Sequence, residues 1–481
     1  MQRKANKPSI ETLASLCKRR GFIFQSSELY DGINGFWDYG PLGAELKRNI
    51  REMWWKHVVQ FREDVVGLDC SIIMHPRVWE ASGHTSNFAD PMVDCKSCRK
   101  RFRADQLCEE QGLKLNRTAD GFALPPGARC AVCGSNDLTP PRAFNLMFRT
   151  HVGPVEEDSA MAYLRPETAQ GIFVQFQNVL SVARKKVPFG IAQIGKAFRN
   201  EINPRNYTFR SREFEQMELE FFVKPGTDAQ WHEYWVKERL RWYQLVGLPA
   251  ESLKPYVYGK DELAHYASAC VDVMYDFPFG FQELEGIAAR GDFDLAQHQK
   301  FSGKSMEYFD DETKEKYVPH VIEPSAGVDR IALAILCEAY REEWAPTAGV
   351  EGGAIEAEPG KQPPKGYEPR TVMAFAPTVA PIKVAVLPLL KNKPELVAKA
   401  REVFDTLRQR WNCFWDAAGA IGRRYRRQDE AGTPYAVTVD FDTLSDNTVT
   451  LRDRDTMKQE RVPVAELVGR LEGLLSWGRP G

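Results

Sequence analysis

The chain has 481 residues, which is too long for one compact core and indicates two or three domains. Hydrophobic residues make up 43% and charged residues 27%, as in ordinary globular proteins, and a net charge of −2 excludes recognition of nucleic acid by overall charge. No apolar run is long enough to span a membrane and no secretory signal begins the chain, so we expect a cytoplasmic protein with no membrane partner.

The N-terminal part is expected to be helical in two places. Residues Glu11–Arg20 form a short helical pattern that ends before a glycine. A longer pattern follows Pro41, a residue suited to the first turn of a helix, and its apolar residues recur at helical spacing up to Phe61. The adjacent Trp54 and Trp55 give this helix a wide apolar surface, which fits either core packing or a subunit interface.

Residues 94–141 have the character of an insertion into a larger domain. They carry two CxxC pairs separated by 31 residues and little apolar periodicity. In a reducing compartment such pairs indicate a metal site rather than disulfides, and four thiolates suit a tetrahedral structural zinc. A catalytic metal is not expected, because protein sulfur would fill every position. Four free cysteines are the alternative. The expected zinc ligands are Cys95, Cys98, Cys130 and Cys133.

A dense run of charged and aromatic residues extends from Ala197 to Phe222. Two strands, Gly190–Glu201 and Glu213–Val223, are expected to form a hairpin about a polar turn. Because alternate residues of a strand share a face, the second strand has one apolar face suited to a core. With Arg199 of the neighbouring strand, the other face predicts a site for a flat ligand with an anionic and a cationic end, although a solvated surface is the alternative. That face carries Phe214, Gln216, Glu218 and Glu220.

The rest of the chain divides at a change in composition. Strand-like and helical segments alternate up to Tyr340, including the expected helices Trp231–Val246 and Gly327–Tyr340. Residues rich in Gly, Pro, Glu and Ala then predict a flexible linker or surface loop, and alternating strands and amphipathic helices predict a small α/β domain after it. The predicted divisions are 1–93 and 142–345 for one interrupted domain, 94–141 for the insertion, 346–379 for the linker and 380–481 for the last domain.

Glycine-rich nucleotide signatures are absent, since neither GxxxxGK[ST] nor GxGxxG occurs after a strand. Other segments resemble the motifs of class II aminoacyl-tRNA synthetases. The proline-led helix at 41–61 is similar to motif 1, FRNE followed by FRSREFEQME to motif 2, and GVDR before an apolar helix to motif 3. Together with DYGPLG, RPETAQGIF, ELEGIA, VIEPSAGVDR and YRRQDEAGTPYAVTVD, the set resembles the homodimeric glycyl-tRNA synthetases over nearly the whole chain.

This resemblance implies an α+β fold, with a catalytic domain on an antiparallel sheet, the zinc-knuckle insertion and a C-terminal α/β anticodon-binding domain. It implies a glycine–tRNA ligase of protein biosynthesis, which joins glycine to ATP as glycyl-adenylate, releases pyrophosphate and transfers glycine to the 3′ end of tRNA(Gly). It further implies a homodimer formed through the motif 1 helix. No separate editing domain is expected, because no amino acid is smaller than glycine.

Two arginines are expected by this resemblance to offset the charge of the ATP phosphates and so to be catalytic. Arg199 would contact the α-phosphate, and Arg330 the γ-phosphate from a helix start, where free N–H groups add positive charge. Phe214 would stack on adenine, and Glu283 would lie beside ATP and its Mg²⁺. A surface ion pair is the alternative for either arginine. The full set expected to contact ATP is Arg199, Asn200, Glu201, Phe209, Arg210, Phe214, Glu283, Leu284, Gly327, Asp329 and Arg330.

Glycine offers only an ammonium and a carboxylate to a binding site. Several acids should therefore surround the ammonium, and tight walls should exclude the methyl group of alanine by about 1–3 kcal/mol, by analogy with overpacking of a core. An ordinary ion pair is the alternative for each acid. By resemblance, the residues expected to contact glycine are Arg103, Glu167, Phe214, Gln216, Glu218, Glu323, Ser325 and Gly327.

Contacts with tRNA are expected at three places. The turn Ile202–Arg212 and the insertion would meet the acceptor end. In the last domain, basic residues gather around Tyr425, which fits contact with RNA phosphates and a stacked base, or else a solvated helix. Residues 416–419 depart from the DDSG-like sequence common in the family, so some anticodon contact is expected to differ. The basic residues are Arg423, Arg424, Arg426 and Arg427.

Two other interpretations compete. One is a class II synthetase for histidine, threonine or proline, which the glutamates of RPETAQ, EFEQME and VIEPSAG argue against. The other is a synthetase-like accessory subunit that has lost its site, which the retention of Arg199, Glu201 and Arg330 argues against.

Overall fold

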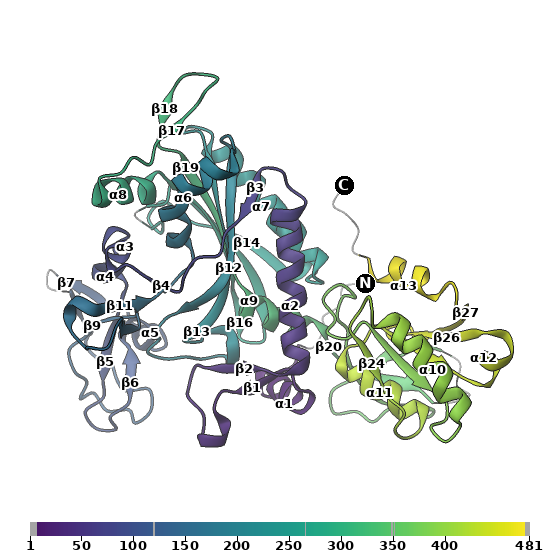
Figure 1. The fold of residues 1–481 in the computed structure, drawn as a ribbon. Helices are drawn as coiled ribbons and strands as arrows, with labels where there is room; N and C mark the ends of the chain where they lie inside the picture. The colour runs from purple at the N-terminus through teal and green to yellow at the C-terminus, as the bar shows by residue number, and fades with distance from the viewer. Residues whose placement is uncertain (1–6, 119–120, 265, 348–349, 351, 477–481) are drawn as a thin grey trace.

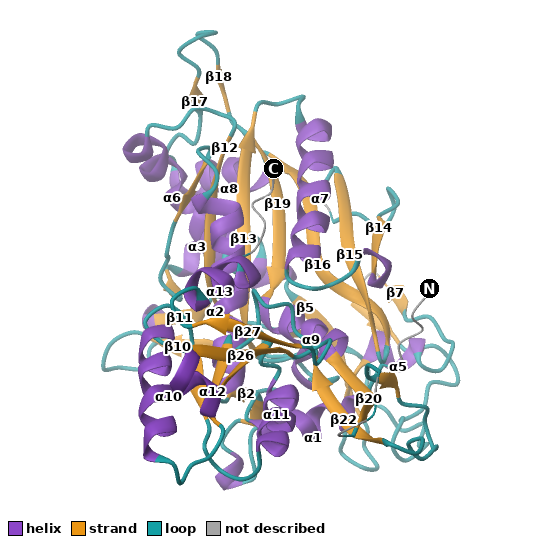
Figure 2. Cartoon of the chain, turned by 90° about the vertical axis from the view of Figure 1, so that its right-hand side faces the viewer, coloured by secondary structure: helices purple, strands orange, loops and turns teal. Residues whose placement is uncertain are grey.

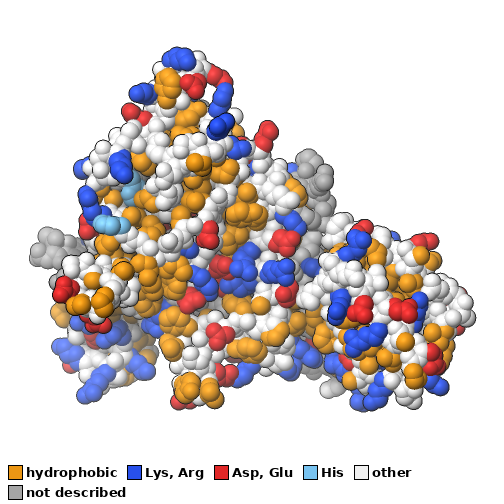
Figure 3. Space-filling view, viewed as in Figure 1, with side chains coloured by type: hydrophobic (Ala, Val, Ile, Leu, Met, Phe, Trp, Pro, Cys, Tyr) orange, Lys and Arg blue, Asp and Glu red, His pale blue; other side chains and the backbone are white. Residues whose placement is uncertain are grey.

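The computed structural model describes residues 7–118, 121–264, 266–347, 350 and 352–476 of the chain. Figure 1 shows a large lobe built around a tall sheet, a small subdomain at one side of it, and the C-terminal domain at the other. Over these ranges, no helix combines the length and the apolar character needed to cross a membrane. On the face seen in Figure 3, Lys and Arg gather near the C-terminal domain with Asp and Glu among them.

A seven-stranded sheet forms the centre of the large lobe, in the order β14-β15-β16-β19-β13-β12-β3. Only β3 runs parallel to its neighbour, and the remaining pairs are antiparallel, so the expected antiparallel catalytic sheet is confirmed. Its strands are β3 (Val65–Gly67), β12 (Phe189–Phe198), β13 (Glu213–Val223), β14 (Leu253–Val257), β15 (Ala269–Phe277), β16 (Gly280–Gly291) and β19 (His320–Gly327).

The expected hairpin forms, but its first strand is shorter than predicted. Strand β12 ends at Phe198, and Arg199 closes the turn by donating its backbone N–H to the Arg212 carbonyl at 2.9 Å. Arg199 and Glu201 therefore lie in the turn instead of sharing a strand face. The alternation of β13 holds, because Met217, Leu219 and Phe221 belong to the main hydrophobic core.

Helices cover both faces of this sheet (Figure 2). The long helix α2 (Pro41–Trp55), α7 (Asp228–Leu245) and α9 (Val328–Ala339) bury apolar residues in the main core, whereas α6 (Ala169–Ala183) and α8 (Phe293–Ser302) enclose a second core. Trp54 is fully enclosed, and an added Cβ at Gly67 would overlap the Trp55 ring, so both tryptophans are used in packing within the chain. One π-helical turn, Lys56–Gln60, extends α2.

Shorter elements surround this framework. Helix α1 is capped by the Ser9 hydroxyl and ends at Gly21 in the left-handed conformation, with φ 76°. The flanking elements are α1 (Ile10–Arg20), β1 (Ile23–Gln25), β2 (Trp37–Tyr39), β4 (Ile73–Met74), α3 (Pro76–Ala81), α4 (His84–Asn87), β10 (Arg149–His151), β11 (Met161–Leu164), β17 (Tyr308–Phe309) and β18 (Lys316–Tyr317).

The insertion forms its own small subdomain beside the sheet (Figure 1). Strand β5 pairs with both β6 and β9, so the chain leaves the large lobe and returns to it on adjacent strands. A core of Val93, Ala104 and Leu107 holds it together. Its elements are β5 (Ala89–Asp94), β6 (Arg101–Arg103), α5 (Ala104–Glu109), β7 (Asn116–Thr118), β8 (Gly121–Ala123) and β9 (Arg142–Asn145).

Part of the expected linker, 346–379, is β-structure, and the described residues that precede and follow β21 up to residue 366 are loop. Strands β20 (Tyr340–Pro346) and β22 (Tyr367–Met373) pair along their whole length, with β21 (Ile355–Glu356) at the outer edge of β20. The buried Arg370 then pairs with Asp429 of the C-terminal domain at 2.9 Å. Backbone pairing and this buried ion pair hold residues 367–373 of the expected linker in place.

The C-terminal domain has its own core and a five-stranded sheet in the order β24-β23-β25-β26-β27, parallel over its first three strands. This confirms the small α/β domain. Its elements are β23 (Val384–Pro388), α10 (Pro394–Leu407), β24 (Cys413–Trp415), α11 (Ile421–Ala431), β25 (Tyr435–Val439), α12 (Phe441–Asp446), β26 (Thr448–Asp453), β27 (Gln459–Pro463) and α13 (Leu467–Leu475).

Candidate active site

A polar pocket lies where β13, β16 and β19 meet the start of α9. It gathers segments that are far apart in sequence, namely the turn after β12, ELEGIA and GVDR. Apart from Asn200, every residue expected to contact ATP lines it. The lining residues are Arg199, Glu201, Thr208, Phe209, Arg210, Ser211, Phe214, Gln216, Glu283, Leu284, Ser325, Gly327, Asp329 and Arg330.

Arg199 faces this pocket between two aromatic rings. Its guanidinium lies 5.4 Å from the ring centre of Phe88 and 5.3 Å from that of Phe214, and its Nε donates to the Pro166 carbonyl at 3.0 Å. A guanidinium has five N–H donors, and this bond uses one of them. The side chain is thus oriented by Nε while its forked end can bind an anion.

Arg330 projects into the pocket from the first turn of α9. It lies 4.5 Å from the ring centre of Phe209 and donates to the Glu283 carbonyl at 3.2 Å. Its ion pair with the Glu283 carboxylate, at 3.1 Å, is partly open to solvent, with the Glu283 side chain 45% exposed. Neighbours fix the arginine in place, and an anion can still reach it.

Glu201 and Arg210 form a pair across the turn, 3.6 Å apart. Burial lowers the pKa of Arg210, and the charge of Glu201 opposes this effect. Asn200 does not line the pocket, and its backbone N–H donates to the Leu146 carbonyl at 2.7 Å. The structure therefore groups Glu201 and Arg210 with the two arginines but leaves Asn200 apart.

Asp329 lines the pocket, but its carboxylate already has partners. One oxygen accepts from Lys47 of α2 at 2.8 Å and the other from the Glu215 backbone N–H at 2.7 Å. Although burial favours its neutral form, Lys47 holds the pKa of Asp329 below its ordinary value. The Asp329 carboxylate thus ties α9 to α2 and β13, and the expected contact of this residue with ATP stays a prediction. Lys47 was missed, although it falls on the apolar stripe of α2, where a lysine needs a buried partner.

A β-bulge turns Glu283 toward the pocket. The register between β15 and β16 shifts at Leu284, which is an extra residue on β16. Glu283 consequently contacts Arg330, whereas Glu285 points toward α7 and pairs with the fully buried Arg239 at 2.6 Å. Simple alternation would place both glutamates on one face.

Beyond the arginines, Glu218 lies at the buried end of the same face of β13. Its carboxylate accepts from the Gln216 amide at 2.9 Å, from the Ser325 hydroxyl at 2.6 Å, and from both the backbone N–H (2.9 Å) and the hydroxyl of Thr168. Burial raises the pKa of Glu218, and the nearby charge of Glu167 raises it further. Thr168 was missed by sequence reasoning, although it directly follows Glu167.

Glu167 and Glu323 complete this acidic group, and each contacts a base. The His84 Nε2 lies 3.3 Å from the Glu167 carboxylate. Burial alone would raise the pKa of Glu167, but His84 holds it below its ordinary value. Glu323 is paired with Arg290; burial raises the pKa of Glu323 to about 8, and Arg290 offsets part of the effect.

Comparisons with known proteins agree with this geometry. Residues 149–340 match the tRNA synthetase class II core domain (G, H, P, S and T), and residues 383–474 match the anticodon binding domain. The glycine–tRNA ligase of Treponema denticola is 52% identical over 97% of this chain and 97% of its own length. Those of Thermobifida fusca and Streptomyces coelicolor are 52% and 51% identical, over 96% and 97% of this chain and 97% and 98% of their own lengths.

The chain belongs to the glycine–tRNA ligase family. Its catalytic domain is a class II synthetase core, and its C-terminal domain is an anticodon-binding domain. The interpretation as a histidine, threonine or proline enzyme is not favoured, because the full-length relatives named above are all glycine–tRNA ligases.

Arg103 lies in the insertion of this family member, away from the glutamate group. It pairs with Asp90 at 3.0 Å and with Asp105 at 2.7 Å. These partners, with the charge of Glu201, keep the pKa of Arg103 above its ordinary value despite burial. The structure thus associates Arg103 with the Glu201 side of the site and not with the buried acids.

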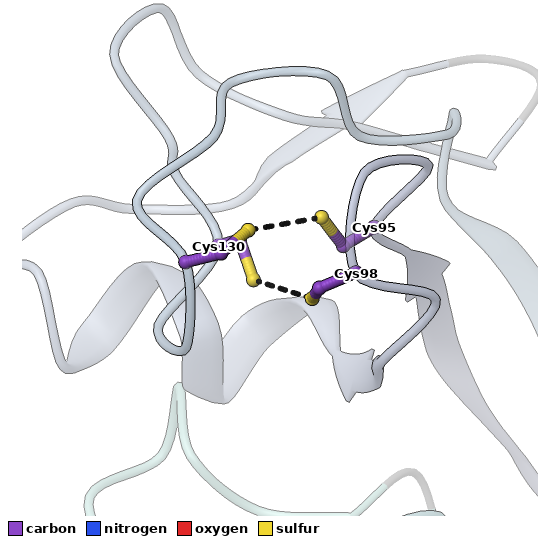
Figure 4. A group of neighbouring side chains, drawn as sticks. Cys95, Cys98 and Cys130 are labelled. Carbon is purple, nitrogen blue, oxygen red and sulfur yellow. Dashed lines mark hydrogen bonds between the residues drawn. The ribbon is translucent and has the colours of Figure 1, made fainter.

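Cys95 and Cys98 face Cys130 from another loop of the insertion (Figure 4), and Cys133 belongs to the same group. Their Sγ atoms all lie within 4.8 Å of one another. Four sulfur atoms this close together suit tetrahedral ligation of one metal ion. The predicted knuckles therefore form one group that could hold a tetrahedral ion.

The basic cluster of the anticodon-binding domain is only partly open to a ligand. Arg424 is 1% exposed and donates to the carbonyls of Pro388 (2.6 Å) and Leu389 (2.9 Å), so it supports the domain interior. Tyr425 is hydrogen-bonded through its hydroxyl to Thr438, and the Arg452 guanidinium lies 4.7 Å from its ring centre. Arg424 and Tyr425 therefore have partners within the domain, and the expected contact of the cluster with RNA stays a prediction.

The other arginines of this helix differ in their partners. Arg426 pairs with Glu368 at 2.7 Å, and Arg427 pairs with Asp416 at 2.6 Å. Arg423 is exposed. Asp416, in the segment that departs from the family pattern, thus positions a basic side chain of α11.

Proposed function

We propose that this chain activates glycine with ATP, releases pyrophosphate and transfers glycine from the adenylate to the 3′ end of tRNA(Gly). The observation that carries the proposal is the placement of two arginines in the pocket and of three neighbouring glutamates beyond them. The arginines are Arg199 and Arg330, and the glutamates are Glu167, Glu218 and Glu323. ATP is anionic at its phosphates, and glycine is cationic at its ammonium. Reaction between the glycine carboxylate and the α-phosphate would occur between the two groups.

At the nucleotide end, Arg199 would contact the α-phosphate and Arg330 the γ-phosphate. Fixed cations lower the barrier when negative charge develops on phosphate oxygens, and neither arginine must reorganise, because Pro166 and Glu283 already orient them. Phe214, with Arg199 over its ring, would stack on adenine. The residues proposed to contact ATP are Arg199, Glu201, Phe209, Arg210, Phe214, Glu283, Leu284, Gly327 and Arg330, with Asn200 and Asp329 acting on the surrounding segments.

Mg²⁺ would be held by the phosphates of ATP and the Glu283 carboxylate. Hard oxygen ligands suit this cation, and the Glu283 side chain is 45% exposed at the pocket wall. When bound, Mg²⁺ would neutralise phosphate charge and orient the pyrophosphate leaving group.

At the amino-acid end, Glu167, Glu218 and Glu323 would surround the ammonium. Ser325 and Gln216 already bond to Glu218 and so fix its position. Excluding alanine would need only a wall that leaves no room for one methyl group, which costs the larger substrate about 1–3 kcal/mol. The residues proposed to contact glycine are Glu167, Phe214, Gln216, Glu218, Glu323, Ser325 and Gly327; Arg103 is proposed to act at the acceptor end of tRNA instead.

Outside the pocket, we assign a structural zinc ion to the four cysteines, because their compact arrangement suits tetrahedral sulfur ligation. The turn Ile202–Arg212 and the insertion would meet the tRNA acceptor end. We infer a cytoplasmic homodimer from the resemblance to the homodimeric family. The apolar face of α2 gives no separate support for a subunit interface, because it is buried within its own chain. Light scattering coupled to size exclusion tests the dimer.

The deciding experiment is amino-acid-dependent exchange of pyrophosphate into ATP, measured with each of the twenty amino acids. Exchange with glycine, and at most weak exchange with alanine and serine, is expected. Exchange with a different amino acid and none with glycine would contradict the specificity. Folded protein without any exchange would instead favour an accessory subunit.

A further inference from the structure

One carboxylate next to the amino-acid end of the pocket has no assigned task. Glu220 lies on β13 and is 0% exposed. Within the part of the chain that the structure describes, neither of its carboxylate oxygens has a hydrogen-bond partner. An ionised carboxylate that is buried without hydrogen-bond partners is strongly disfavoured in free energy. The role of Glu220 therefore depends on whether it is protonated and on which groups surround it.

The sheet register places Glu220 opposite another acid. In the pairing of β13 with β19, Glu218 is opposite Ser325 and Phe221 is opposite Ile322, which puts Glu220 opposite Glu323. Directly opposed side chains of neighbouring strands are about 4.5–5.5 Å apart at Cβ, and like charges there repel each other. Two carboxyl groups at this distance in a buried site hold a proton between them more readily than both ionise.

The surrounding charges do not neutralise the pair. Arg290 of β16 contacts Glu323, but it also holds Asp294 of α8 at 2.8 Å. Glu218 on the same face of β13, and Glu167 before α6, add negative charge. Helix α6 contributes no charged residue, β12 presents Ile191 opposite Glu220, and Tyr266 lies against Arg290, 4.2 Å from its guanidinium to the ring centre. The base beside Glu167 is His84.

Five acids, namely Glu167, Glu218, Glu220, Asp294 and Glu323, thus lie near Arg290 and His84 before any substrate binds, and the charge of Arg199 acts on Glu167 and Glu218 as well. Burial, together with the charge of Glu323, raises the pKa of Glu220 well above its ordinary value, and burial raises that of Glu323 to about 8. The Glu323 side chain is 12% exposed, so a proton on this pair can reach solvent through Glu323.

We propose that Glu220 and Glu323 share one proton in the free enzyme and that the ammonium group of the amino acid displaces this proton to solvent when it binds. The inference rests on the proposed function, since it takes Glu323 as a contact of the ammonium. Charge is conserved in the exchange, because one positive charge enters the cluster and one leaves it. Glu220 acts through Glu323 and is a positioning residue.

This exchange explains how so many acids fit in one buried site. Full ionisation of all five would destabilise the fold, and full neutralisation would leave nothing to attract an ammonium. A shared proton removes one of these negative charges in the free enzyme, and that charge becomes available only to a cation small enough to reach Glu323. Neutral molecules of similar shape gain nothing from it.

Calorimetry with the full-length protein tests the proposal. The probe is a non-hydrolysable glycyl-sulfamate ester of adenosine, titrated at pH 6.5 in two buffers of different ionisation enthalpy, which gives the number of protons released. The control ligand carries an acetyl group in place of glycyl and so lacks only the ammonium. We expect release of about one proton with the glycyl ligand and none with the acetyl ligand, as linkage between binding and ionisation requires.

The matched variant is Glu220→Gln, which has nearly the same shape as a protonated glutamate. It should release no proton on binding the glycyl ligand, and its KM for glycine should stay flat between pH 6 and 7, where that of the wild type should fall about tenfold. A wild type that releases no proton, or a variant that releases as many as the wild type, would overturn the proposal. Failure of the wild type to bind the glycyl ligand would overturn the proposed function itself.

A second measurement does not depend on how well the variant folds. The infrared difference spectrum of the wild type, recorded with and without the glycyl ligand, should show loss of a protonated-carboxyl band. The acetyl ligand should leave that band in place. A band that persists with both ligands would contradict proton displacement.

Discussion

Arg330→Ala gives the sharpest test of how the pocket works. If the forked end of Arg330 makes two charge-assisted hydrogen bonds to the γ-phosphate, each contributing about 1.5–3 kcal/mol, their loss raises the barrier by about 3–6 kcal/mol. At about 1.4 kcal/mol per factor of ten, kcat/KM for ATP–pyrophosphate exchange should fall by about 10²–10⁴-fold.

Stability should change far less than activity. The ion pair of Arg330 with Glu283 is partly exposed, and such pairs contribute at most about 1 kcal/mol. Thermal unfolding of the variant should therefore stay close to the wild type, while exchange with glycine nearly disappears. Arg330→Lys should lie between the two, since it keeps the charge but loses the planar fork.

The matched control is Arg408→Ala directly after α10, which removes an exposed arginine that pairs with Asp405 at 3.2 Å. It should leave exchange unchanged. Near-wild-type exchange by Arg330→Ala would refute the assigned contact with phosphate. A loss of activity that follows an equal loss of folded protein would show that Arg330 is structural.

Three further predictions concern the rest of the chain. Cys130→Ser should lower bound zinc, measured by elemental analysis, from about one per chain toward zero, and a normal zinc content would exclude the proposed ligand set. Arg424→Ala should destabilise the C-terminal domain in thermal unfolding, because it leaves buried carbonyls without a donor. Arg423→Ala should instead keep the stability of the domain and weaken tRNA binding several-fold. The reverse pattern would contradict a structural role for Arg424 and an RNA-binding role for Arg423. Burial lowers the pKa of Lys383 to about 7, so above pH 7 the unfolded chain binds more protons than the folded chain, and the free energy of unfolding should rise with pH from 7 to 10. Lys383→Met should flatten this rise, measured by urea titrations at pH 7 and 9. An unchanged rise in the variant would show that another group titrates.

The sequence by itself indicated a catalytic domain on an antiparallel sheet, a C-terminal α/β domain and the order of the motifs. Those features follow from local patterns, because the alternation of β13 puts Met217, Leu219 and Phe221 on the core face whatever the neighbouring strands do. The spacing of the cysteines similarly predicted that four thiols form one group. Family membership also depends on local motifs, since each keeps its residues within a few positions of one another.

Only the tertiary structure shows which charged residues pair with one another inside the protein and which can contact a ligand. Asp329 and Lys47, Glu323 and Arg290, and Arg370 and Asp429 are partners that lie far apart in sequence, and no local pattern pairs them. The bulge at Leu284 separates Glu283 from Glu285, which alternation would have placed together. Burial and the charges of spatial neighbours set the protonation of each acid, and both depend on contacts that exist only after folding. For that reason, Glu220 could be read from the sequence as one of a row of acids, and only the folded chain shows that it is enclosed opposite Glu323.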